Sequence, residues 1–254
     1  MGRKVRRRVE APWHWDPCTL WGYWRQPRLP EVRYDEIART ACEGDIVLFT
    51  SSGVWAWMQD FWTDSTVSHV GMVVREPDSG RLCLAESTLP DERVADVRTN
   101  TVRDGPMIVP LAARIRTYIE SFGYDVRYRA LCPGARPSAD VCATRRGVIW
   151  DMMQRKLDEG IGFDSDALTL MAANTGYLET APTCWMWEDA VYDAADKEFC
   201  SSLVVECLQE IGVMEPARPH WSYAPRDFTD PPRQDLLLAP GMSYGPERRV
   251  VYYE

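Results

Sequence analysis

A cysteine at the start of a predicted helix is the most reactive side chain that the sequence offers. Apolar side chains recur at helical spacing along one face of residues 200–212, at Leu203, Val204, Cys207, Leu208 and Ile211. Cys200 begins this helix, and Gly212 stands where a C-terminal cap is expected. Unpaired backbone N–H groups at a helix N-terminus stabilise a thiolate and donate to an oxyanion formed beside it. We therefore predict that Cys200 is a nucleophile, whereas Cys207 points into the core.

A thiol nucleophile needs a neighbouring base, and the chain has three histidines with which to supply one. His14 lies in a segment rich in proline and tryptophan, and His220 lies between a proline and a tryptophan. His69, in contrast, begins the apolar run 69–74, which is typical of a strand. We therefore predict that His69 is the general base.

Glu86 is the nearest carboxylate that could orient His69. Residues 69–74 and 82–86 predict a β-hairpin around the turn 76–80. If an even number of turn residues is unpaired, Glu86 lies diagonal to His69 on the same face of the hairpin. An odd number places the two side chains on opposite faces. Asp64 or Ser87 would then orient His69, unless a β-bulge restores the register.

Composition and hydrophobic pattern predict a globular α+β protein. The 254 residues are 45% hydrophobic and 26% charged, as in ordinary globular proteins. We expect a basic, Trp/Pro-rich arm at residues 1–30 and a single domain at 31–254, with a helical and loop insertion at about 135–195. Short apolar runs predict at least four strands, and we place strands at 46–49, 69–74, 82–86, 107–111 and 124–131, and an edge strand at 250–253. Helical spacing predicts helices at 53–62, 112–121, 139–159 and 200–212, with a long loop at 160–182.

The charge distribution argues against a nucleic-acid partner. The chain has 29 basic and 38 acidic residues, and five of the basic ones fall within the first eight positions. An acidic body repels phosphate backbones, so only the short arm could attract them. The basic arm with its tryptophans could instead make peripheral contact with a membrane surface.

Several classes of site and location are not expected from the sequence. No apolar stretch approaches the roughly 18 residues that span a bilayer, and no hydrophobic signal core follows the basic start. We therefore expect a cytoplasmic protein, or a virion-associated one if its source is a virus. The eight cysteines include no C-x-x-C pair, so we expect reduced thiols, no zinc site and no cofactor.

Six short segments, in this order, resemble the circularly permuted branch of the NlpC-type papain-like superfamily, the YiiX-like group of bacteria and large DNA viruses. They are Gly44-Asp45-Ile46-Val47-Leu48-Phe49, Ser68-His69-Val70-Gly71-Met72-Val73-Val74, Leu84-Ala85-Glu86-Ser87, Val126-Arg127-Tyr128-Arg129-Ala130-Leu131, Phe199-Cys200-Ser201-Ser202-Leu203-Val204 and Tyr223-Ala224-Pro225-Arg226-Asp227-Phe228. The similarity spans about residues 40–230. It implies a permuted papain-like fold, in which an antiparallel sheet or barrel packs on the helix that carries the cysteine.

The resemblance also implies a role for each candidate residue. Cys200 would be the nucleophile, His69 the general base and then general acid, and Glu86 the polar third member. The permutation explains why the histidine and the carboxylate precede the cysteine in the chain. Ser202 departs from the pattern, since many relatives have Glu at its position, and this puts contacts with the substrate in doubt.

These roles predict a cysteine hydrolase that forms a thioester acyl-enzyme from an amide or ester. The substrate would be a small-molecule, lipid or peptide acyl compound. An alcohol or amine acceptor would instead make the protein an acyltransferase or a phospholipase-like enzyme, as in the lecithin:retinol acyltransferase relatives. The third alternative is a catalytically silent binding or virion protein that keeps the fold.

Overall fold

The computed structural model describes residues 29–50, 66–89, 94–132, 134–163, 197–232 and 235–252. Nearly all of the predicted arm 1–30, the whole predicted helix 53–62 and most of the loop 160–182 lie outside these ranges. The alternative orienter Asp64 lies outside them as well.

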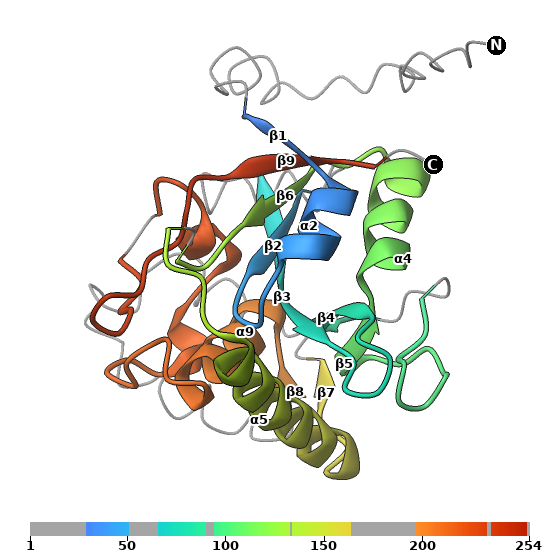
Figure 1. The fold of residues 1–254 in the computed structure, drawn as a ribbon. Coiled ribbons are helices and arrows are strands. Elements are labelled where there is room, and N and C mark those ends of the chain that lie inside the picture. The colour runs from blue at the N-terminus through green and yellow to red at the C-terminus, as the bar shows by residue number, and fades with distance from the viewer. Residues whose placement is uncertain are drawn as a thin grey trace, which may run out of the picture.

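Seven strands form one sheet with the spatial order β1-β9-β6-β2-β3-β4-β5 (Figure 1). In that order they are Glu31–Arg33, Arg248–Val251, Val126–Arg129, Ile46–Thr50, Val67–Arg75, Leu82–Thr88 and Gly105–Pro110. All neighbouring pairs are antiparallel except β1 with β9, which are parallel. A separate two-stranded sheet joins β7 (Gly162–Phe163) to β8 (Lys197–Glu198). With the helices below, the chain has a mixed α+β fold.

Helices cover both faces of the large sheet. They are α2 (Tyr34–Thr40), α4 (Leu111–Arg116), the π-helical turn η1 (Thr117–Phe122), α5 (Ala139–Asp158), α9 (Cys200–Glu210) and the 3-10 turns η2 (His220–Ser222) and η3 (Pro225–Phe228). One core cluster joins α5 and α9 to strand positions such as Leu48 and Met72. A second joins α2 and α4 to the alternate positions, such as Phe49 and Val73. Successive strand residues point to opposite faces, so the two clusters lie on opposite sides of the sheet.

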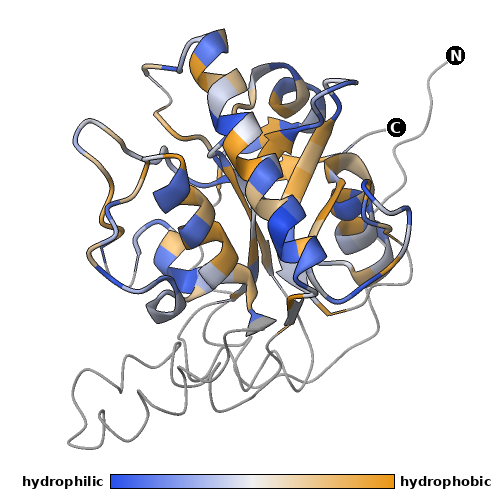
Figure 2. Cartoon of the chain, turned by 90° about the horizontal axis from the view of Figure 1, so that it is seen from below, coloured by the Kyte–Doolittle hydropathy of each residue, from blue (hydrophilic) through white to orange (hydrophobic). Residues whose placement is uncertain are grey.

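Burial follows the hydrophobic pattern of the sequence. The interior strands are mainly hydrophobic, while the helices around them carry hydrophilic side chains (Figure 2). Strand β2 is buried along its whole length, as its continuous apolar run predicts. No helix within the described ranges is both long and apolar enough to cross a bilayer.

The predicted edge position of the C-terminal strand is wrong. The C-terminal strand is not at the edge, because β9 lies between β6 and the unpredicted strand β1. Strand β1 is three residues long and buries only Val32, so the sequence carries almost no alternating pattern there. The expected alternative of a barrel is also not met in the described part of the chain, because β1 and β5 are not paired with each other.

The β3–β4 hairpin has the even-numbered register. Met72 lies opposite Ala85 and Arg75 lies opposite Leu82, so the hairpin places Gly71 across from Glu86. A Cβ atom at position 71 would lie 2.7 Å from Cγ of Leu84. Glycine at this position therefore allows the Leu84 side chain to pack against β3.

Candidate active site

His69 and Glu86 form a buried pair on β3 and β4. Nε2 of His69 lies 2.8 Å from Oε2 of Glu86. His69 is 8% exposed and Glu86 is fully buried. The even register of the hairpin produces this contact, because it puts the two side chains on the same face of the sheet. Ser87, the other described candidate for orienting His69, instead donates a hydrogen bond to the carbonyl oxygen of Glu198 at 2.6 Å.

Cys200 is the first residue of α9, as predicted from the sequence. Helix α9 packs against β3 and β4, and Cys207 is buried in the core. The first hydrogen bond within the helix runs from the Leu203 N–H to the Phe199 carbonyl at 3.2 Å. The N–H groups of Cys200 and Ser201 therefore belong to the first turn, where helices leave donors unpaired. These N–H groups can stabilise negative charge on the sulfur or on an oxyanion beside it.

The Cys200 thiol and the His69 ring are within reach of a side-chain hydrogen bond. Glu86 engages Nε2, which leaves Nδ1 as the ring nitrogen that can face the sulfur. Burial alone would lower the pKa of His69, but the hydrogen bonds and charges of Cys200 and Glu86 outweigh it and raise this pKa to about 9. His69 is therefore an imidazolium at neutral pH, and a cation beside a sulfur favours the thiolate.

Arg114 completes the site, and the sequence analysis missed it. Its Nε and Nη2 atoms each lie 2.6 Å from Oε1 of Glu86, and the residue is 1% exposed. Burial by itself would raise the pKa of Glu86, but the charge of Arg114 and the hydrogen bond with His69 hold it below the usual range. Glu86 therefore stays anionic and orients His69. The sequence feature that could have indicated Arg114 is its position between the apolar residues Ala113 and Ile115 in a predicted helix.

Two aromatic rings contact the His69 ring. The Phe49 centroid lies 5.4 Å from that of His69, and the Tyr118 ring lies nearly parallel to His69 at 6.4 Å. Phe49 and Tyr118 also contact each other, with centroids 4.4 Å apart. These rings restrict rotation of the imidazole, so the ring remains directed at its polar partners.

Hydrogen bonds fix the start of α9 relative to the rest of the fold. The Ser202 hydroxyl accepts from the Phe199 N–H at 3.2 Å and donates to the Phe199 carbonyl at 2.9 Å. The Ser201 hydroxyl donates to the Tyr223 carbonyl at 2.7 Å. With the Ser87 bond to Glu198, these contacts link β4 and the segment before η3 to the turn that carries Cys200.

Asp45, which lies in the first segment of the resemblance, has a structural role. Asp45 is fully buried, and its two carboxylate oxygens each lie 2.7 Å from a nitrogen of Arg136. Oδ1 also accepts from the Leu131 N–H at 2.8 Å, and the Tyr128 hydroxyl donates to Oδ2. This carboxylate joins β2 to β6 and to the segment after β6, and it makes no contact with Cys200 or His69 among the interactions described.

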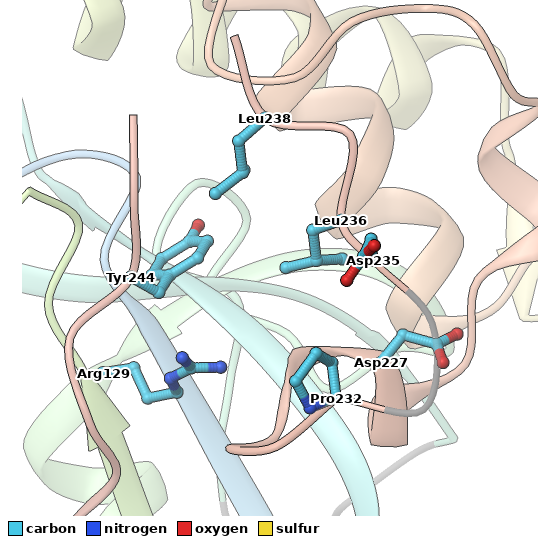
Figure 3. A pocket seen from close by; sticks show the side chains of 7 residues that line it. All are labelled: Arg129, Asp227, Pro232, Asp235, Leu236, Leu238 and Tyr244. Atoms are coloured by element: carbon cyan, nitrogen blue, oxygen red, sulfur yellow. The ribbon is translucent and has the colours of Figure 1, made fainter. Parts of the chain in front are cut away.

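A small cavity of about 180 Å³ lies elsewhere in the fold (Figure 3). Its lining residues are Arg129, Asp227, Pro232, Asp235, Leu236, Leu238 and Tyr244. Arg129 donates to the carbonyls of Phe228, Thr229 and Gly245 at 2.6 to 2.8 Å. Its guanidinium is thus engaged in joining β6 to the C-terminal segments, which favours a structural role for this region.

Comparison with known proteins assigns no family to the chain. No protein-family model matches the sequence, and no curated protein matches it. Among solved structures, metalloprotein yiiX from Escherichia coli O157:H7 (DUF1105) is similar over 81% of this chain and 96% of its own. The sequence identity is 15% and the TM-score is 0.42. A likeness at this level assigns neither a family nor an activity to the chain.

Proposed function

We propose that this protein is a cysteine-dependent hydrolase of amides or esters. Cys200 is the nucleophile, His69 the general base and then general acid, and Glu86 the group that orients His69. The observation that carries the proposal is the position of His69, which is hydrogen-bonded to the Glu86 carboxylate in a buried site and lies beside the Cys200 thiol. A nucleophile, a base and an orienting group in hydrogen-bond contact are the arrangement that covalent acyl transfer requires.

The reaction proceeds through a thioester. The Cys200 sulfur attacks the substrate carbonyl, and N–H groups in the first turn of α9 donate to the resulting oxyanion. His69 gives its proton to the leaving amine or alcohol as the carbonyl re-forms, which leaves an acyl group on the sulfur. His69 then removes a proton from water, the hydroxide attacks the thioester, and the carboxylic acid departs as the thiol is restored.

We further propose that the fold is a circularly permuted papain-like one. Its support is the chain order, in which the strand with His69 and the strand with Glu86 precede the helix with Cys200. The packing of α9 on β3 and β4 is also what that fold requires. Arg114 acts in this proposal as a positioning residue, because two of its nitrogens contact the carboxylate of Glu86.

An activated ester tests the proposed chemistry without knowledge of the natural substrate. After brief exposure to p-nitrophenyl acetate near neutral pH, we expect intact-mass spectrometry to show one acetyl group and peptide mapping to place it on Cys200. The nitrophenolate release should show a burst equal to the enzyme concentration, because the thioester forms faster than water removes it. The Cys200→Ala variant should show neither the adduct nor the burst.

Cys132→Ser provides the matched control, since Cys132 is a half-buried thiol on another segment. This variant should keep the adduct and the burst. Acetylation of wild type at other cysteines or lysines, with Cys200 unmodified, would contradict the proposal. Added alcohols or amines that shorten the life of the adduct more than water does would show acyl transfer from the same intermediate.

A further inference from the structure

We propose that Glu198, Glu206 and His220 bind one divalent transition-metal ion, at a site separate from the proposed catalytic residues. Each of the three side chains offers one ligand atom, and these atoms all lie within 4.8 Å of one another. The sequence gives no hint of this cluster, because the three residues lack the short, regular spacing of common zinc motifs.

Three neighbouring segments bring the ligands together. Glu198 is in β8, immediately before α9, and Glu206 follows in the second turn of that helix. His220 begins η2, which packs against α9. The site is therefore built on the same helix as Cys200 but from other side chains.

Two residues of this cluster carry buried polar atoms without hydrogen-bond partners in the described part of the chain. Glu198 is 3% exposed, and its Oε1 atom has no hydrogen-bond partner among the described residues. Nδ1 of His220 is also buried without a partner in this part of the chain. Such atoms are rare in folded proteins because each one loses hydration and gains nothing in return. A bound cation would satisfy them.

Among the described residues, Lys156 is the one whose positive charge contacts the carboxylates of both Glu198 and Glu206. Its Nζ atom lies 2.8 Å from Oε2 of Glu198 and 2.7 Å from Oε2 of Glu206. One ammonium group carries a single positive charge against these two carboxylates. A divalent ion would supply the missing charge, and Lys156 would have to move away to admit it.

The ligand chemistry selects the type of ion. The imidazole of His220 offers one ring nitrogen as a ligand. Two carboxylate oxygens with one imidazole nitrogen suit Mn²⁺, Fe²⁺ or Zn²⁺, whereas Mg²⁺ and Ca²⁺ favour oxygen ligands alone. Three protein ligands would leave positions on the ion for water.

Titration with Mn²⁺ tests the site, because this ion avoids the eight cysteines. The loss of the free-ion electron paramagnetic resonance signal measures binding to the full-length protein. We expect saturation at one ion per chain in wild type. Glu206→Gln should weaken binding by about tenfold or more, on the scale seen when a metal site is damaged. Glu210→Gln removes an exposed charge from the same helix outside the cluster and should bind as wild type does.

Lys156→Gln distinguishes a metal site from an ordinary ion-pair cluster. Without the competing ammonium group, Mn²⁺ should bind more tightly than in wild type, and the ion should raise the thermal midpoint of this variant more than that of wild type. Absence of saturable binding in both wild type and Lys156→Gln would overturn the proposal. Equal affinity in wild type and Glu206→Gln would also overturn it. Circular dichroism without metal checks that each variant is folded.

Discussion

Replacement of His69 by alanine is expected to slow acylation of Cys200 by p-nitrophenyl acetate by about 10²- to 10⁴-fold, the range that general acid–base catalysis contributes. The reason lies in the two contacts of the imidazole. His69 reaches the Cys200 thiol on one side and the Glu86 carboxylate, at 2.8 Å, on the other. Without the ring, the thiol has no base, and the buried Glu86 carboxylate loses its hydrogen-bond partner in the site. The rate constant of the burst, measured by stopped flow, gives the effect directly.

His14→Ala is the matched control, because it removes a histidine from the N-terminal arm. Its burst rate should equal that of wild type. The burst rate of Glu86→Gln should lie between those of wild type and His69→Ala. Glutamine can still contact the imidazole, but it carries no charge to keep the imidazole protonated. An unchanged burst in a folded His69→Ala protein would exclude His69 as the base.

Replacement of Arg114 by methionine is expected to lower the free energy of unfolding by about 3 to 5 kcal/mol, which is the usual cost of removing one partner of a buried ion pair. Arg114 is 1% exposed, and two of its nitrogens contact the fully buried Glu86. Methionine fills a similar space but leaves the carboxylate without its main counter-charge. Urea denaturation at neutral pH measures the change.

A double variant separates charge from packing. Adding Glu86→Gln to Arg114→Met removes the uncompensated charge, so it should restore much of the lost stability. Arg116→Met, on the same helix but exposed, should change the stability by no more than about 0.5 kcal/mol. If Arg114→Met and Arg116→Met have the same effect, the ion pair with Glu86 does not stabilise the fold.

The part of the site that lies within a hairpin or at a helix end was predictable from the sequence. The apolar runs predicted β3 and β4. They left two registers open: an even turn puts Glu86 on the same face as His69, and an odd turn puts it on the opposite face. The helical spacing after residue 200 placed Cys200 at the first turn of α9. Local rules sufficed here because strand alternation and helix periodicity are set by neighbours in the chain.

The contacts between distant segments were not predictable in the same way. Arg114 meets Glu86 across 28 positions of sequence, and an arginine in a short helix is more often a surface residue. Strand β1 was missed because only Val32 is buried in it. The cluster of Glu198, Glu206 and His220 forms only where three segments pack together. Such arrangements depend on tertiary packing, which a single sequence does not display.

Alkylation of the native protein by iodoacetamide tests the central claim, that His69 activates the Cys200 thiol. At about pH 6 an ordinary thiol with a pKa near 8.5 is scarcely ionised. Burial raises the pKa of Cys83 to about 11 and that of Cys142 to about 12, and it also raises that of Cys207, so these thiols should react even more slowly. Each of the eight cysteines can be followed by peptide mass spectrometry.

The pH profile gives the sharpest result. Because the pKa of His69 is about 9, the imidazolium persists from pH 6 to pH 8. The account predicts that Cys200 reacts before the other cysteines from pH 6 to pH 8, because the imidazolium lies beside it throughout this range. In His69→Ala, Cys200 should lose this advantage at each pH. Equal rates and equal profiles in wild type and His69→Ala would contradict the claim that Cys200 and His69 form a catalytic pair.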